Sequence, residues 1–289
     1  MKKLKFKKFL IILAGTIAVG CIFPFVYREF LSNKPNIILI VIDALRPDHL
    51  SCYGYERNTS PNIDKLAKEG VMFTQAITAG GWTAESVPST LTGTYSFIHQ
   101  VRYWNSPRNF TIRTLPQLLN SKSLNSALFT NHHPISMIDI KDGFDLIYIA
   151  DHSETDDHQL TLKVINWLKE NKDKPFFVYL HYKGPHVPYR PPEPYKSKYF
   201  YDRFNIKKEI PISKDKSYSN WEKGKIPHIV VESNISDVSY YTAQYDGAIS
   251  YTDDQVGRLI DSLKKFDLLE NTLIILIADQ GEMLGEHDI

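Results

Sequence analysis

The seven residues Asn36–Ile42 (NIILIVI) constrain the fold of this chain more than any other segment. They are almost all apolar and rich in β-branched side chains, with no alternation of apolar and polar positions. A strand of this composition is typical of a central strand that is buried on both faces of a parallel sheet. Because the run is followed directly by Asp43, we expect this strand to end in a carboxylate.

Further apolar runs alternate with segments of helical periodicity along the chain. At one helix start, Ser60 is expected as the N-cap and Pro61 as the first helical residue. The alternation predicts an α/β fold, a doubly wound and mostly parallel sheet sandwiched by helices, with ligands bound beyond the carboxyl ends of the strands. Residues 191–236 lack a period and are expected to form a long surface excursion near the site. The other strand candidates are Val71–Thr74, Ser126–Thr130, Pro175–His181 and Thr272–Asp279, and the other helix candidates are Leu115–Ser121, Gln159–Asn171 and Val238–Phe266.

The N-terminus carries a membrane signal. Five lysines in residues 1–8 precede an uncharged run of 19 residues, Phe9–Tyr27, which is long enough for one transmembrane helix. The lysines favour a cytoplasmic N-terminus, so we expect a single-pass protein of the cell membrane, with residues 28–34 as a linker and residues 35–289 on the extracytoplasmic side. The alternatives are a cleaved signal peptide, a lipoprotein signal with Cys21 as the lipid acceptor, and a buried soluble helix. The apolar run continues beyond Cys21, which argues against cleavage.

The charge distribution argues against one class of partner. The formal net charge is +1, but five of the 34 basic side chains lie in the N-terminal segment, so the rest of the chain is slightly acidic. We therefore expect no nucleic-acid partner. The two cysteines, Cys21 and Cys52, provide neither a disulfide framework nor the spacing of a zinc site.

Four segments, in this order, resemble successive motifs of the sulfatase branch of the alkaline-phosphatase superfamily. They are NIILIVIDALRPDHLSCYGYERNTSPNIDKLAKEGVMFTQA, HYKGPHVPYRPP, YDGAISYTDDQVGRLIDSL and ADQGEMLGEHDI. The resemblance implies that residues 35–289 form a sulfatase-like catalytic domain, in which a divalent metal and an adjacent nucleophile attack a sulfate or phosphate ester. Relatives continue with a smaller C-terminal sheet, so we expect either a fragment of a longer protein or an unusually short domain that lacks this subdomain.

The resemblance further implies a metal site built from oxygen ligands. Asp43 matches the first metal-binding aspartate of the family, and Asp279 and Gln280 match a later pair that is Asp followed by His or Asn in relatives. A glutamine can bind through its amide oxygen, and the nucleophile Thr83 would add a hydroxyl. Such a set suits one Ca²⁺, Mg²⁺ or Mn²⁺ better than Zn²⁺.

The segment GWTAESVPSTLTG offers two candidate nucleophiles, Thr83 and Ser86. Ser86 begins a segment similar to the formylglycine pattern of sulfatases, but Thr90 stands where that pattern has arginine. The family places its nucleophile ten residues before the closing glycine, which is Gly93, and that spacing falls on Thr83 rather than on Ser86, seven residues away. T-A-x-S-V-P also resembles the nucleophile segment of phosphoethanolamine transferases. The spacing favours Thr83, whose hydroxyl a bound metal would activate. Two alternatives remain: Ser86 is the nucleophile, or the segment is the start of a helix and has no catalytic role.

Histidines supply the remaining candidate site residues. The resemblance implies that His186, in the PHVPY segment, lies in the pocket and bonds the ester oxygens or assists the leaving group. His132 and His133 follow a strand candidate and are expected to donate to the substrate. His181 lies inside a strand candidate and is expected to pack or to orient a neighbour. For His186, a loop histidine held by structural hydrogen bonds is the alternative.

Together these features predict a membrane-anchored, metal-dependent enzyme that hydrolyses or transfers sulfate or phosphate esters through a covalent intermediate on Thr83. The substrate would be an ester of a small molecule, a glycan or a lipid headgroup. The missing arginine argues against formylglycine and so keeps phosphoester chemistry open beside sulfate-ester chemistry. The alternative is a non-catalytic or truncated sulfatase-like protein that binds anionic glycans or lipid headgroups.

The membrane signal generates a prediction about topology. Protease added outside intact cells is expected to digest residues 35–289, and the chain is expected to remain in the membrane fraction after a high-salt wash, since an apolar helix is not released by salt. Immunoblotting of the fractions measures both. A mature N-terminus at or after Cys21, found by N-terminal sequencing, would contradict the uncleaved anchor.

Overall fold

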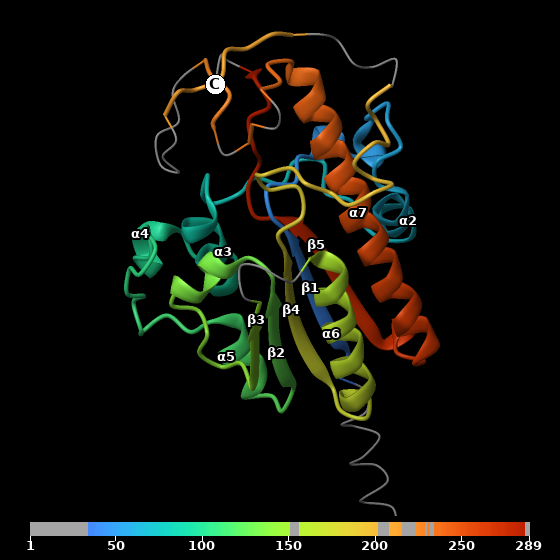
Figure 1. Ribbon diagram of the computed structural model, residues 1–289. Coiled ribbons are helices and arrows are strands. Elements are labelled where there is room, and N and C mark those ends of the chain that lie inside the picture. The colour runs from blue at the N-terminus through green and yellow to red at the C-terminus, as the bar shows by residue number, and fades with distance from the viewer. Residues whose placement is uncertain are drawn as a thin grey trace, which may run out of the picture.

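A single sheet of five parallel strands organises the protein (Figure 1). The computed structural model describes residues 34–150, 156–201, 208–215, 224–228, 230–231 and 234–286. The strands lie in the order β3-β2-β4-β1-β5. Their bounds are β1 Asn36–Ile42, β2 Asn125–Thr130, β3 Leu146–Ile149, β4 Phe176–Tyr182 and β5 Thr272–Ala278.

Helices cover both faces of this sheet, as predicted (Figure 1). Helices α6 and α7 pack together on one face, and α3 packs on the other. The α-helices are α2 Pro61–Glu69, α3 Thr83–Thr92, α4 Ser96–His99, α5 Leu115–Asn120, α6 Asp157–Asn171 and α7 Val238–Lys265. Four 3₁₀ turns are η1 Pro47–His49, η2 Ser51–Tyr53, η3 His133–Met137 and η4 Leu269–Asn271.

Strand β1 is buried on both faces, which confirms the interpretation of its apolar run. Ile38, Ile40 and Ile42 pack in the core under α6 and α7, whereas Leu39 and Val41 pack in the second core under α3. The alternation of the two sets follows from the period of two along a strand. Because β4 and β5 flank β1 in parallel, the carboxyl ends of all three strands meet at the same edge of the sheet.

The strands predicted from the sequence differ from the structure at two places: one predicted strand is wrong, and one strand was not predicted. Val71–Thr74 is not a strand: it lies on the surface, where Val71 is 81% and Phe73 is 71% exposed, and it pairs with none of the described strands. Conversely, β3 was missed. It is only four residues long, pairs on one side with β2 and leaves Leu146 and Ile147 largely exposed, so its sequence carries no burial pattern.

The start of α2 also differs from the expectation in one respect. Pro61 is the first helical residue and Ser60 occupies the N-cap position, but the Ser60 hydroxyl bonds Asp64 instead of the helix backbone. The capping acceptor is Asp253 of α7, whose carboxylate accepts from the backbone N–H groups of Asn62 and Ile63. A side chain distant in sequence therefore supplies the cap.

Residues 191–236 form a long connection, as expected. Among its described residues there are turns and isolated bridges but no helix or strand, and Ile210, Ile226 and Val230 nevertheless reach the main core. Within the described part of the chain, no helix has both the length and the apolar character required to cross a membrane. The predicted anchor Phe9–Tyr27 lies outside the described residues.

The packing of α6 generates a stability prediction. Leu168→Ala is expected to lower the free energy of unfolding by about 2–5 kcal/mol, because Leu168 is fully buried in the main core and its truncation opens a cavity. Leu162→Ala is the matched control on the same helix. Leu162 is 40% exposed, so the same substitution is expected to change stability by less than about 1 kcal/mol. Urea unfolding measures both, and equal losses would contradict the assignment of the core.

Candidate active site

Acidic and histidine side chains converge at the carboxyl ends of the three adjacent strands. Asp43 directly follows β1, Asp279 directly follows β5, and His181 is near the end of β4. All three are buried, and each offers one ligand atom within 4.8 Å of the others. The strand order thus brings together residues that are 236 positions apart in sequence, at the edge where open α/β sheets bind their ligands.

Thr83 and Gln280 complete this cluster. Thr83 is the first residue of α3 and is buried. The side-chain nitrogen of Gln280 lies 3.5 Å from the Thr83 hydroxyl and 3.3 Å from one carboxylate oxygen of Asp43. Asp279 accepts a hydrogen bond from the backbone N–H of Ala44 at 3.2 Å. The four residues predicted as metal ligands, Asp43, Thr83, Asp279 and Gln280, therefore lie in one cluster.

The electrostatics of the two carboxylates differ. Burial alone would raise the pKa of Asp43, but the neighbouring His132 and His186 outweigh it and hold that pKa well below its usual range. Burial and the charge of Asp43 instead raise the pKa of Asp279 well above its usual range. A second negative charge is therefore unfavourable at this position unless a cation compensates it.

The unsatisfied atoms of the cluster fit a divalent cation. Oδ2 of Asp279 and Oε1 of Gln280 are buried and have no hydrogen-bond partner among the described residues. Buried polar atoms normally have a partner, and a cation would satisfy both oxygens while offsetting the charge of the two carboxylates. The donor set is rich in oxygen, and His181 adds one nitrogen.

The predicted histidines lie at different positions around the cluster. His132 Nδ1 is 2.8 Å from Oδ2 of Asp43, and its ring stacks on Trp104. His186 packs edge-on against His132, with ring centroids 5.4 Å apart, and its Nδ1 bonds the carbonyl oxygen of Val187 at 2.8 Å. His133 is the first residue of η3 and is half-buried. His132 and His186 thus adjoin the carboxylates.

Two further residues of the site were not assigned a direct role from the sequence. His181, expected to pack or orient a neighbour, lies with Nε2 3.6 Å from Oδ2 of Asp43. The sequence feature that could have indicated His181 is a single histidine in an otherwise apolar and aromatic strand. Glu282 follows Gln280 by two positions, and burial raises its pKa to about 7, with His186 opposing the shift. Its place in the GEMLGEH segment was the available signal.

The chain belongs to the sulfatase family. The family model for Sulfatase matches residues 35–289. Iduronate 2-sulfatase from Mus musculus is 28% identical over 87% of this chain and 55% of its own length. The chain thus spans about half the length of this relative.

Solved structures show the same fold at lower identity. The phosphonate monoester hydrolase of Agrobacterium radiobacter has a TM-score of 0.70 and 21% identity, over 89% of this chain and 64% of that one. The C-terminal periplasmic domain of EcEptC from Escherichia coli, in complex with Zn, has a TM-score of 0.64 and 18% identity, over 88% and 65% of the two chains. A mostly parallel α/β sheet covered by helices is therefore a fold shared with these proteins.

The carboxylate pair generates a prediction about metal and stability. Asp279→Asn is expected to lower Mn²⁺ affinity by at least about 10-fold, the loss that even an outer-shell substitution typically causes. In metal-free buffer, however, wild type is expected to lose stability as the pH rises above about 4, since the pKa of Asp279 is higher in the folded than in the unfolded chain. Asp279→Asn is expected to lose less stability than wild type over this pH range.

Thermal unfolding with and without Mn²⁺, over a range of pH, measures both effects. Asp254→Asn is the control, because Asp254 is a partly exposed residue of α7 that pairs with Arg258. Equal responses of the two variants would contradict a metal site at Asp279.

Proposed function

We propose that this protein is a membrane-anchored, metal-dependent enzyme that hydrolyses or transfers a sulfate or phosphate ester through a covalent intermediate on Thr83. The observation that carries the proposal is the position of the Thr83 hydroxyl, 3.5 Å from Gln280 and beside the two carboxylates Asp43 and Asp279. A nucleophile, candidate metal ligands and histidines in one buried cluster are the parts that ester cleavage requires.

The two candidate nucleophiles differ in their surroundings. Ser86 lies one helical turn after Thr83, and its hydroxyl donates to the backbone carbonyl of Thr83 at 3.5 Å. The Thr83 hydroxyl, by contrast, lies 3.5 Å from the side-chain nitrogen of Gln280, and its proximity to Asp279 opposes the rise in the pKa of that carboxyl. This contrast supports Thr83 as the nucleophile and a local structural role for Ser86. Thr83 also begins α3, where the helix dipole favours an approaching anion.

The chain's own residues divide the reaction between them. Thr83 Oγ1 would give up its proton to water and form a bond to the sulfur or phosphorus. The ester oxygen would leave with the electron pair of the broken bond and take a proton from His186 Nε2. Water, or an acceptor alcohol in a transfer, would then release the group from Thr83. Asp43, Thr83, Asp279 and Gln280 would hold a divalent ion. When bound, this ion would favour the Thr83 alkoxide and polarise the ester oxygens. His132, with His133 as a further donor, would orient the anion.

The metal is proposed to be Ca²⁺, Mg²⁺ or Mn²⁺ on the basis of the oxygen-rich donor set. His181 introduces a nitrogen donor next to Asp43, and nitrogen is a ligand that Zn²⁺ prefers. Zinc is therefore the competitor that metal analysis has to exclude. Competition of Zn²⁺ against Ca²⁺ and Mn²⁺, followed by elemental analysis of the purified protein, decides between them.

The proposed substrates are small-molecule, glycan or lipid-headgroup esters. The name of the mouse relative indicates a sulfate ester, whereas the name of the Agrobacterium neighbour indicates a phosphonate ester. Both ester types present a tetrahedral anionic centre to the nucleophile. The proposed location, with the domain outside the cytoplasmic membrane, rests on the lysines and the apolar run at the N-terminus.

The nucleophile assignment generates the decisive prediction. Thr83→Ala is expected to lower kcat by about 10⁴-fold or more while substrate binding is partly kept, because the covalent step is lost and the anion-binding groups remain. Ser86→Ala, the matched control in the same helix turn, loses one long hydrogen bond and is expected to cost on the order of 1 kcal/mol in stability. Rates with 4-nitrophenyl sulfate and 4-nitrophenyl phosphate measure the difference.

Mass spectrometry of the peptide that contains both residues provides an independent measurement. A trapped adduct on Thr83 is expected. A formylglycine at position 86, or an inactive Ser86→Ala beside an active Thr83→Ala, would transfer the role to Ser86.

A further inference from the structure

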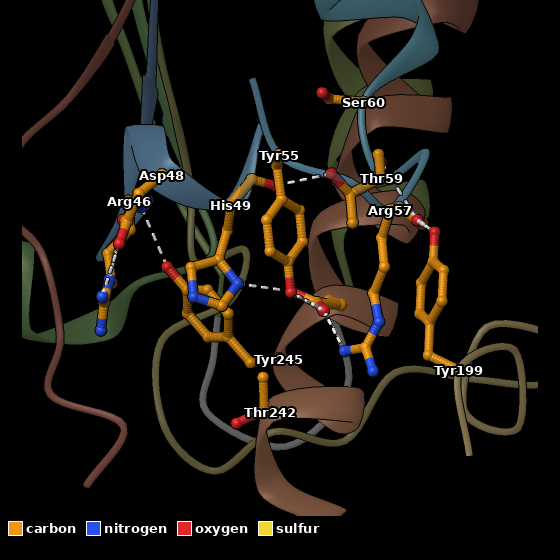
Figure 2. A network of polar contacts seen from close by, with 12 residues as sticks. Arg46, Asp48, His49, Tyr55, Arg57, Thr59, Ser60, Tyr199, Thr242 and Tyr245 are labelled. Atoms are coloured by element: carbon orange, nitrogen blue, oxygen red, sulfur yellow. Dashed lines mark hydrogen bonds and ion pairs between the residues drawn. The ribbon is translucent and has the colours of Figure 1, made fainter. Parts of the chain in front are cut away.

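Tyr245, in the middle of α7, holds the backbone directly after Asp43 through two hydrogen bonds. Its hydroxyl donates to the carbonyl oxygen of Ala44 at 2.6 Å and accepts from the backbone N–H of Arg46 at 2.9 Å. Figure 2 shows the Tyr245 hydroxyl aimed at this turn. The side chain is fully buried, and burial raises the pKa of the phenol well above its usual range, so the hydroxyl keeps the proton it donates.

The turn that Tyr245 holds has an unfavourable backbone conformation. Ala44 has φ of 58°, in the left-handed region, which costs a residue with a Cβ atom about 1–2 kcal/mol. Such a conformation persists only where the surroundings fix it. The surroundings of Ala44 are the Tyr245 hydroxyl at its carbonyl and the Asp279 carboxylate at its N–H. The turn therefore connects both candidate metal-binding aspartates to α7.

Tyr245 is itself held in place by its neighbours. Its ring packs edge-on against His49 and Tyr189, with centroid distances of 5.0 Å and 5.6 Å. The next residue, Asp246, is buried, contacts His49 Nδ1 at 2.6 Å and pairs with Arg57 at the same distance. Two consecutive residues of α7 thus fix both the turn after Asp43 and the segment that follows it.

We propose that Tyr245 is a positioning residue of the metal site: its phenol locks the left-handed turn at Ala44, so that Asp43 and Asp279 present their carboxylates to one cation. The inference rests on the proposed metal-dependent function and adds a residue to it. Tyr245 acts through the backbone. Loss of its hydroxyl would leave the Ala44 carbonyl and the Arg46 N–H without this partner, and Ala44 would relax toward a more favourable φ.

Tyr245→Phe tests the proposal, with Tyr241→Phe as the matched control. Tyr241 lies one turn earlier on the same helix, is also buried, and donates to the backbone carbonyl of Ile235 at 2.6 Å. Both variants lose one phenol hydroxyl, so both are expected to lose thermal stability. Only Tyr245→Phe is expected to weaken Mn²⁺ binding, by about 10-fold as for other residues that orient metal ligands, measured by electron paramagnetic resonance titration. Equal Mn²⁺ affinities of the two variants would overturn the proposal.

Rescue distinguishes positioning from general destabilisation. The double variant Tyr245→Phe/Ala44→Gly is expected to recover most of the lost Mn²⁺ affinity, because glycine adopts the left-handed region without the Cβ penalty. If Tyr245→Phe does not fold, the double variant is expected to fold and to bind Mn²⁺ nearly as tightly as Ala44→Gly alone, and a remaining deficit of about 10-fold would overturn the proposed role of the turn.

A readout that needs no metal separates this inference from the proposed function. Hydrogen exchange in metal-free buffer is expected to be faster over residues 43–48 in Tyr245→Phe than in Tyr241→Phe, because the turn opens. If wild type binds no Mn²⁺ but this difference is found, the metal-dependent function fails and the locked turn stands. If wild type binds Mn²⁺ and the difference is absent, the proposal about Tyr245 fails alone.

Discussion

The burial of Asp43 next to Asp279 is the interaction on which the rest of the site depends. Both carboxylates lie at the ends of strands that are covered by helices, so neither can reach bulk water. Removing two such groups from water costs several kcal/mol each unless partners compensate. The neighbouring histidines, the backbone N–H of Ala44 and the Gln280 amide each offset part of this cost. The unsatisfied oxygens that remain are what a cation would complete.

Helix α7 connects this cluster to the rest of the molecule. Its 28 residues pack against α6 and α2 and bury three acidic or phenolic side chains that act far from their own helix. Tyr245 holds the turn after Asp43, Asp246 holds the segment around His49, and Asp253 caps α2. Because every one of these contacts spans more than 180 residues of sequence, the site is rigid only when the whole α/β domain is folded.

The same fold supports more than one ester chemistry, so the activity depends on the particular residues at the strand ends. In this chain a threonine begins α3, a glutamine follows Asp279, and an alanine follows Asp43. Ala44 adopts a left-handed backbone conformation, which the Asp279 carboxylate stabilises at its N–H and the Tyr245 hydroxyl at its carbonyl. The arginine that is missing after Ser89 argues against formylglycine and so agrees with the proposed hydroxyl nucleophile Thr83.

The local pattern of the sequence predicted the central elements of the fold and several residues of the candidate site. A strand buried on both faces can be recognised from its unbroken apolar run, as in Asn36–Ile42, and the motif positions indicated Asp43, Thr83, Asp279, Gln280 and His186. Only the tertiary structure revealed the features that depend on contacts between residues distant in sequence. These features are the edge strand β3, the cap that Asp253 provides for α2, the approach of His181 to Asp43 and the hydrogen bonds of the Tyr245 phenol to the turn at Ala44. The physical reason is that such contacts join residues that neither propensity nor periodicity relates, and only strand order and helix packing bring them together.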